Sequence, residues 1–229
     1  MSHEIIKPEK GIVVVFGGWS GIFTYDTERF ARTFGRLLER DYGLPHDYCE
    51  KFYISAWGRT VEDQFSRIMT DDGRPPAQSE IEAFAKAWKE RAYNKPRPTK
   101  YDLRAGAMEC LDSLGRTGCK RAVSSNMDPY EMFMEISNHG ILDKIDLWAG
   151  GPPILPDKSV HWRYFKDQLG GIEGRAVVVA DSKRTAENAA EWKCKVVRIN
   201  LPHTRGQFYS DAEIGDLAEL PKTLPKLFP

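Results

Sequence analysis

Polar side chains that could bind or react with a small molecule stand at the ends of short apolar stretches. The four residues are Ser20, Ser125, Asn126 and Asp181. The stretches before them, at 12–16, 121–125 and 175–180, are typical of buried strands in a parallel sheet. Ligands bind α/β sheets at the carboxyl ends of the strands. We therefore expect these hydroxyl, amide and carboxylate groups to meet at one edge.

A glycine-rich loop at 17–21 follows the first stretch and contains Gly18, Trp19 and Ser20. The backbone N–H groups of such a loop can cradle an anion, or the glycines could serve only tight packing. The position at the end of the first strand favours an anion or a small polar ligand. Ser20 has no His and Asp beside it in the sequence, which favours a ligand-binding hydroxyl over a nucleophile. No Asp or Glu occurs anywhere from residue 11 to residue 25.

Two cationic residues extend the candidate site. Lys158 could pair with a ligand anion or with Asp181, or it could be an exposed lysine ahead of a helix. Arg59 could recognise an acid group through bidentate hydrogen bonds. We interpret His161, three residues after Lys158, as a surface histidine.

Simpler explanations exist for two of the strand ends. Asp181 and Ser182 could be the N-cap of a helix at 183–192. Ser125 and Asn126 could form no more than the turn that starts a helix. These alternatives stay open on the sequence alone.

The composition limits the class of protein. The chain has 229 residues with 33 basic and 33 acidic side chains, and this neutral balance argues against nucleic acid as a partner. The sequence contains no apolar segment of about 20 residues and no signal-peptide core, so we predict no membrane association and a cytoplasmic location. Four cysteines without metal-site spacing are expected to be reduced and buried. The sequence leaves the oligomeric state open.

The elements that must position the candidate residues fall into two parts. Residues 27–98 are expected to be all-helical, and Ser79 with Glu82 has the spacing of a capping box. The rest alternates helices with strands, the last at 195–199. The pattern predicts an α/β fold: a Rossmann-like parallel sheet with helices on both faces and an inserted all-helical cap domain. The core would comprise 1–26 and 99–229, and the cap 27–98.

The order of these features resembles the haloacid dehalogenase-like superfamily, from about residue 11 to 221. That family carries Asp-x-Asp-Gly after its first strand, and alignment puts Gly18 at the nucleophile and Ser20 at the general acid. The resemblance implies that Ser125 hydrogen-bonds the transferred phosphoryl group, that Lys158 neutralises the charge of the nucleophile and the substrate, and that Asp181 is a magnesium ligand. Mg²⁺ is expected of the family, but its ligand set is incomplete here, so we predict no metal residues and leave the cofactor unknown.

Three functions follow from this resemblance. We favour an enzyme with altered chemistry, without a phosphoaspartate, on a small anionic metabolite. Ser20, Lys158 and Asp181 would then be catalytic, and Gly18, Trp19, Ser125, Asn126 and Arg59 would bind the substrate. The first alternative is a catalytically inactive binding or regulatory protein on the same scaffold. The second is a conventional phosphatase or dehalogenase, ranked last because the first loop offers no attacking carboxylate.

Overall fold

A computed structural model describes the protein at residues 11–24, 26–57, 59–93, 103–151, 159–201, 204 and 208–228. The chain divides into two compact units. One comprises Met1–Thr24 with Asp102–Pro229, and the other comprises Tyr25–Tyr101. We describe each unit by itself.

The first unit is built on one sheet. Its strands are β1 (Val13–Phe16), β2 (Lys120–Ser125), β3 (Leu147–Gly150), β4 (Ala176–Ala180), β5 (Lys195–Ile199) and β6 (Ala212–Ile214). The six strands lie in the order β3-β2-β1-β4-β5-β6, and all neighbours are parallel. Strands β1 and β4 are completely buried apolar runs, as expected for the centre of a parallel sheet.

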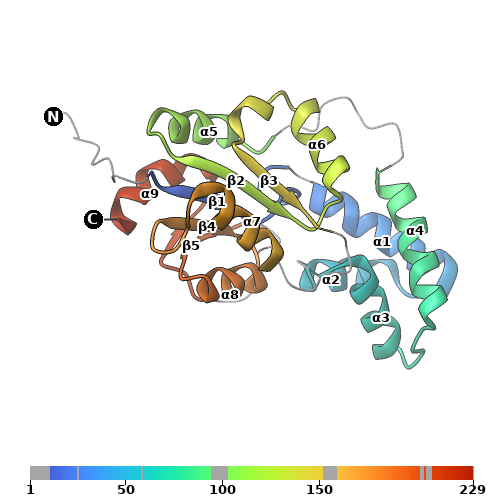
Figure 1. Cartoon of the computed structure of the whole chain (residues 1–229). Coiled ribbons are helices and arrows are strands. Elements are labelled where there is room, and N and C mark those ends of the chain that lie inside the picture. The colour runs from blue at the N-terminus through green and yellow to red at the C-terminus, as the bar shows by residue number, and fades with distance from the viewer. Residues whose placement is uncertain are drawn as a thin grey trace. The chain divides into compact units, whose positions relative to one another are not determined.

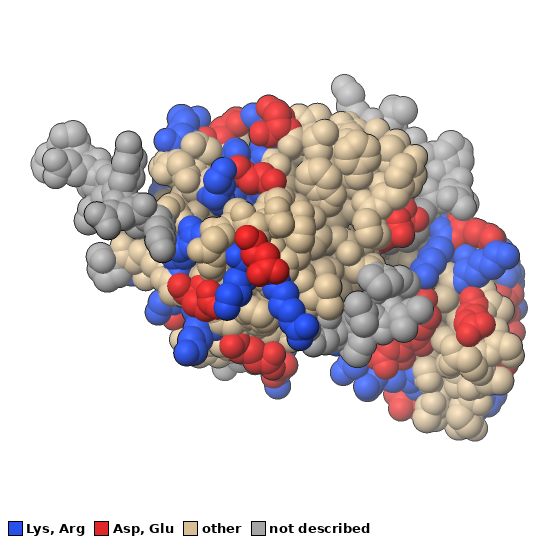
Figure 2. Space-filling model, in the orientation of Figure 1, with Lys and Arg blue, Asp and Glu red and all other residues tan. Residues whose placement is uncertain are grey.

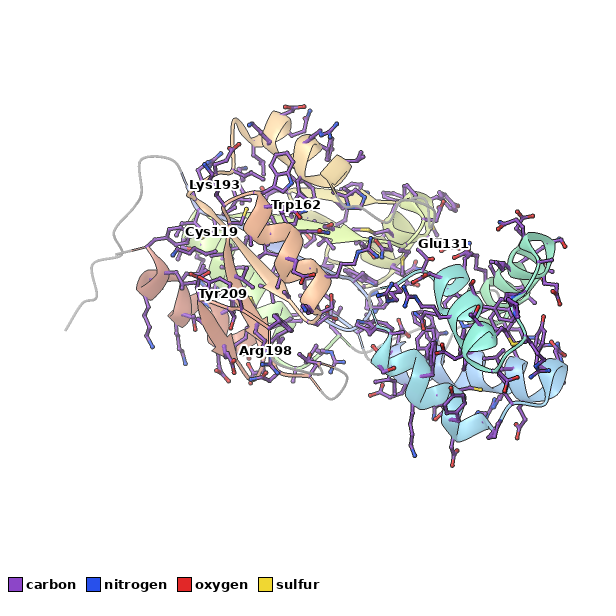
Figure 3. The ribbon with its side chains drawn as sticks, turned by 90° about the horizontal axis from the view of Figure 1, so that it is seen from below. Cys119, Glu131, Trp162, Lys193, Arg198 and Tyr209 are labelled. Carbon is purple, nitrogen blue, oxygen red and sulfur yellow. The ribbon has the colours of Figure 1, made fainter. Side chains whose placement is uncertain are left out.

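Helices cover both faces of this sheet (Figure 1). They are α5 (Ala107–Arg116), α6 (Pro129–Asn138), α7 (Ser159–Leu169), α8 (Lys183–Glu191) and α9 (Leu220–Leu227), with short 3-10 turns at Leu142–Lys144 and Leu217–Glu219. One face packs against α7 and α8, where Trp162, labelled in Figure 3, is fully buried with Val13 and Val178. Right-handed crossovers place α5 and α6 on the other face.

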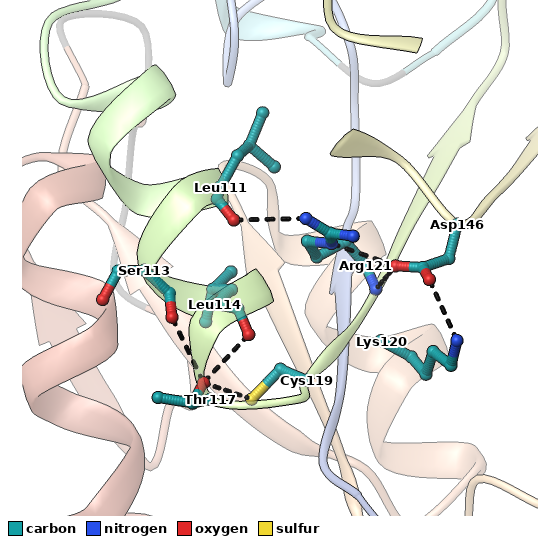
Figure 4. A network of polar contacts seen from close by, with 8 residues as sticks. All are labelled: Leu111, Ser113, Leu114, Thr117, Cys119, Lys120, Arg121 and Asp146. Atoms are coloured by element: carbon teal, nitrogen blue, oxygen red, sulfur yellow. Dashed lines mark hydrogen bonds and ion pairs between the residues drawn. The ribbon is translucent and has the colours of Figure 1, made fainter. Parts of the chain in front are cut away.

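A polar network fixes the amino ends of β2 and β3 (Figure 4). Asp146, just before β3, accepts hydrogen bonds from the backbone N–H and the guanidinium of Arg121, both at 2.9 Å, and from Lys120 Nζ at 3.0 Å. Burial of Asp146 opposes its ionisation, but the bonds from Arg121 and Lys120 outweigh that effect and lower its pKa. The network therefore stabilises the charged carboxylate.

The second unit is helical, with α1 (Asp26–Tyr42), α2 (His46–Ser55), α3 (Val61–Asp71) and α4 (Gln78–Tyr93). Its core includes the face of α1 that holds Phe30 and Phe34, and Phe65 stacks on Phe84 at 4.2 Å between ring centroids. The predicted capping box at Ser79 is wrong. Helix α4 begins at Gln78, before Ser79. Glu80 rather than Glu82 caps its first turn, since Glu80 Oε2 accepts from the N–H of Ala77 at 3.0 Å.

These elements confirm the predicted α/β class with a Rossmann-like parallel sheet. A second sequence prediction also needs correction, because β6 follows the strand at 195–199 that was expected to be the last. Among the residues described, every helix is too short or too polar to cross a bilayer.

Candidate functional site

The parallel register brings three of the predicted residues to one level at the carboxyl edge of the sheet. Phe16 is the register partner of Val123 in β2 and of Val179 in β4. Gly18, Ser125 and Asp181 each lie two residues further along their own strands. These residues come from three adjacent strand ends. Neighbouring strands are about 4.8 Å apart, so the three backbones lie close together.

The loop after β1 leaves backbone donors unused. Gly17 N–H continues the sheet ladder by donating to the carbonyl of Val179 at 2.9 Å. In the part of the chain that the structure describes, the next three N–H groups, of Gly18, Trp19 and Ser20, donate to no protein acceptor. Successive N–H groups without a described acceptor can donate to a bound anion.

Gly17 and Gly18 differ sharply in the space around them. A Cβ built on Gly17 would lie 2.3 Å from Thr185 Cγ2 and 2.9 Å from the carbonyl oxygen of Val179, so a side chain is excluded there. A Cβ built on Gly18 would meet nothing within 4 Å. Position 18, which is level with Ser125 and Asp181, is therefore the loop glycine that can accept a side chain.

Ser20 is partly exposed at the far end of the donor row. Its hydroxyl has no hydrogen-bond partner among the residues that the structure describes. A serine nucleophile needs a base within hydrogen-bond reach. The described contacts give Ser20 the character of a ligand-binding hydroxyl rather than an activated nucleophile.

Trp19 is 0% exposed, so its indole ring lies inside the protein rather than on an open surface. The ring stacks on Phe23 at 5.2 Å and meets the edge of His139 at 5.6 Å. His139 Nδ1 donates to the carbonyl of Glu135 one helical turn earlier, at 2.8 Å. The indole thus anchors the loop, and the backbone N–H of Trp19 is one of the three groups without a described acceptor.

The end of β2 carries two serines with different partners. Ser125 is buried, and its Oγ accepts from the N–H of Met127 at 3.2 Å, which forms the turn that also holds the half-buried Asn126. Ser124 Oγ is hydrogen-bonded to His161 Nδ1 at 2.9 Å. The interpretation of His161 as a surface residue is wrong, because it is buried between α7 and β2.

The ring of His161 also reaches the end of β3. A Cβ built on Gly151 would lie 3.2 Å from His161 Nε2 and 3.8 Å from the carbonyl oxygen of Ser125. His161 therefore joins the ends of two strands at the candidate site. No local sequence pattern signals this contact, because Ser124 and His161 are 37 residues apart.

Asp181 is buried at 4% exposure directly after β4, and it makes polar interactions in the structure. Ser182, not Asp181, is the N-cap of α8, because its Oγ accepts from the N–H of Thr185. Asp181 therefore does not cap this helix through its side chain. It is the acid that the strand ends contribute to the candidate site.

One residue of the loop's support was missed in the sequence. The backbone N–H of Arg104 donates to the carbonyl of Phe23 at 2.7 Å, and its buried guanidinium donates to the carbonyl of Gly21. Arg104 therefore holds the closing half of the loop. A lone arginine after a loop carries no sequence signal for this contact.

Two predicted residues do not join the described site. Lys158 lies outside the described residues. Arg59 belongs to the helical unit, where its guanidinium is exposed and pairs with Asp63 at 2.8 Å.

The described residues do not fit the magnesium site that the resemblance implies. No group of three or more His, Cys, Asp or Glu residues that could hold a metal ion occurs among them. The loop after β1 contains no acid. The single carboxylate of Asp181 does not satisfy the oxygen ligation that Mg²⁺ requires. No step of the chemistry is therefore assigned to a metal.

Comparisons with known proteins give a clear structural result. No protein-family model and no curated protein sequence matches the chain. A β-phosphoglucomutase of Clostridium difficile superposes with a TM-score of 0.76 at 15% identity, over 95% of this chain and 96% of that one. A haloacid dehalogenase-like hydrolase of Streptococcus pneumoniae gives 0.74 at 15% identity, over 93% and 98%. A predicted phosphoglycolate phosphatase of Haemophilus somnus gives 0.72 at 17%, over 94% and 98%.

The chain has the haloacid dehalogenase-like fold. The matches cover more than nine-tenths of it, so the fold accounts for both the sheet and the helical insert. At these identities the similarity concerns the fold alone, and the named activities belong to those proteins. The alignment of Gly18 and Ser20 with the two aspartates of the haloacid dehalogenase-like motif stays a prediction.

Proposed function

We propose that the protein is an enzyme that binds a small anionic metabolite at the carboxyl edge of its sheet and acts on it without a phosphoaspartate. The observation that carries this proposal is the row of three N–H groups at residues 18–20 that have no acceptor among the residues the structure describes. These groups keep the capacity to bind an anion, while the loop offers no acid to attack it. The loop can thus bind an anion but has no carboxylate to attack it.

The roles of the residues follow from their chemistry. The loop N–H groups bind an oxyanion, and Ser20 Oγ donates a further hydrogen bond to it. Asp181 holds or moves a proton, because it is the buried carboxylate at the same level of the sheet. Lys158 balances the charge of the bound anion.

The binding set is completed by residues around the loop. Ser125 and Asn126 shape the neighbouring strand end, and Trp19 fixes the backbone that binds the anion. Arg59 stays a candidate for recognising an acid group of the substrate.

The substrate class rests on the loop and on the structural relatives. Two of those relatives are named for phosphorylated small molecules, phosphoglycolate and phosphoglucose. A phosphate or carboxylate group would satisfy the same donors, so we assign a small phosphorylated or carboxylated metabolite.

The first alternative is an inactive binding protein. The lack of a described partner for Ser20 Oγ favours it, since nothing there activates a nucleophile. The other alternative, a conventional phosphatase or dehalogenase, would need an attacking carboxylate held in line with the bound group. No residue from 11 to 24 can supply one.

Binding is tested with inorganic phosphate as the probe. Titration of ¹⁵N-labelled protein should move the amide resonances of Gly18, Trp19 and Ser20 more than those of Gly21 and Phe23, whose N–H groups are already bonded. Ser20→Ala should weaken binding severalfold but leave the amide pattern intact. If the amides of 18–20 do not respond at millimolar phosphate, the anion site is disproved.

Turnover is tested separately with a panel of phosphorylated and carboxylated metabolites, followed by NMR with and without Mg²⁺. Conversion that survives removal of Mg²⁺ and is lost in Asp181→Asn supports altered chemistry. Phosphate binding without conversion of any compound favours the inactive binder. Rapid Mg²⁺-dependent phosphate release that Asp181→Ala abolishes would establish the conventional phosphatase instead.

A gain-of-function variant tests whether the strand ends can support phosphatase chemistry once the two aspartates are introduced. Gly18→Asp with Ser20→Asp should introduce Mg²⁺-dependent phosphatase activity if Ser125 and Asp181 still surround a bound phosphoryl group. Gly17→Asp with Ser20→Asp is the matched control, because position 17 has no room for a side chain. Equal activity in both variants would show that the level of Gly18 is not special.

A further inference from the structure

The exposed apolar side chains of the sheet unit gather around one strand. Seven large hydrophobic side chains are exposed among the described residues of this unit, and five of them lie on the elements directly before and after β3. These five, the β3 patch, are Tyr130 and Phe133 on α6, Leu142 in the 3-10 turn, and Val160 and Tyr164 on α7. Figure 2 shows a wide area without charged residues over α6 and β3. Large exposed apolar patches mark interaction surfaces.

Strand β3 is itself an open edge. Among the described strands it pairs only with β2, so one row of its backbone N–H and C=O groups faces outward. Its sequence, Leu-Trp-Ala-Gly, contains no charge and no proline. Natural edge strands normally carry such residues, because an unprotected edge pairs with other strands.

The opposite edge of the same sheet provides a direct contrast. Glu213 lies in the middle of β6 and pairs with Arg198 at 3.5 Å. Just before β6, Asp211 accepts from Lys195 Nζ at 3.1 Å and from the hydroxyl of Tyr209 at 3.0 Å. Arg198 and Tyr209 are labelled at this edge in Figure 3. Charged residues thus protect the β6 edge of the sheet, whereas strand β3 contains none.

We propose that β3 pairs with β3 of a second copy of this chain, antiparallel across a twofold axis perpendicular to the sheet. Such a pair is isologous, because each outward N–H meets a C=O of the same strand in the partner. The axis keeps each face of the sheet on its own side, so α6 lies beside α6 and α7 beside α7. The β3 patch then packs against its own equivalent.

The contact area sets the expected strength. Tyr130, Phe133 and Tyr164 are 70%, 36% and 41% exposed. At about 200 Å² for a fully buried aromatic side chain, they contribute roughly 300 Å² per copy before the strand edge is counted. A stable interface buries about 800 Å² per partner. We therefore expect a reversible dimer whose population depends on concentration.

Sedimentation velocity on the full chain, from low to high micromolar concentration, tests the interface. The wild type should shift from monomer to dimer, and Tyr130→Lys with Tyr164→Lys should stay monomeric. Both tyrosines are exposed, so the variant should keep the circular dichroism spectrum and unfolding temperature of the wild type. Met108→Lys with Tyr209→Lys is the control, because both residues are exposed and lie on other elements.

Two results would overturn the proposal. One is a wild type that stays monomeric over the whole concentration range. The other is a dimer that the patch variant and the control variant weaken equally. Amide hydrogen exchange provides a second measurement, since the outward N–H groups of β3 should be protected in the dimer and exchange freely in the monomeric variant.

Discussion

His161 Nδ1 lies 2.9 Å from Ser124 Oγ, and both side chains are buried behind the carboxyl edge of the sheet. This contact joins α7 to β2 across 37 residues of sequence. It fixes one imidazole nitrogen next to the strand end that leads into Ser125. The strength of this connection can be measured.

Ser124→Ala and His161→Ala should each lower the free energy of unfolding by about 1–3 kcal/mol, because each removes a buried hydrogen bond. The double variant should cost less than the sum, with a coupling of about 0.5–3 kcal/mol. Urea unfolding of the four proteins measures both quantities. Strictly additive losses would contradict a direct interaction between the two side chains.

The two loop glycines should respond differently to alanine. Gly17→Ala is expected to destabilise by about 1–3 kcal/mol, because the new methyl group collides with Thr185 and a backbone carbonyl. Gly18→Ala should be neutral or stabilise by about 0.4–1 kcal/mol through the lower entropy of the unfolded chain. Thermal unfolding of the two variants side by side tests this order, and a reversal would mean that the loop has another conformation.

Asp146 should contribute stability that depends on pH. Its pKa is lowered in the folded protein, so its contribution is complete above the unfolded value of about 3.9 and is lost as the pH falls through the lower folded value. Asp146→Asn should cost about 1–3 kcal/mol at neutral pH and progressively less below pH ~4. Denaturant unfolding from neutral to acidic pH measures the difference. The exposed Asp143→Asn variant is the control and should leave the free energy of unfolding at neutral pH close to that of the wild type.

The cysteines should be inert in the folded state. All four are buried and free, and burial raises the pKa of Cys49 to about 11 and of Cys110 and Cys194 to about 12. Because the thiolate is the reactive form, a disulfide reagent at pH ~8 should label the native protein slowly and release four equivalents only after denaturation. Fast labelling of the native protein would show that a thiol is accessible.

The sequence was informative wherever local pattern decides structure. Continuous apolar runs predict β1 and β4 because a central parallel strand is buried on both faces. The spacing of Phe30, Phe34 and Leu37 predicts the buried face of α1 because that spacing repeats every helical turn. Strand ends then bring Gly18, Ser125 and Asp181 to one edge.

Other features depend on contacts that no local pattern encodes. Strand β6 has only three residues and a central glutamate, so nothing in its sequence distinguishes it from a loop. His161 in α7 is buried against Ser124 in β2, which lies 37 residues earlier in the sequence. The N–H groups of the loop that lack a described acceptor are a property of backbone geometry, to which residue type gives no direct guide.

The open surroundings of Gly18 have a genetic consequence. Glycine codons GGT and GGC become aspartate codons by one base substitution, and at this position the new side chain would meet no steric obstacle. At the neighbouring Gly17 the same change would place a side chain against Thr185 and a backbone carbonyl. Where codon 18 is GGT or GGC, one base substitution is enough to introduce a carboxylate at the end of the first strand, which makes this position a practical start for laboratory evolution toward hydrolysis.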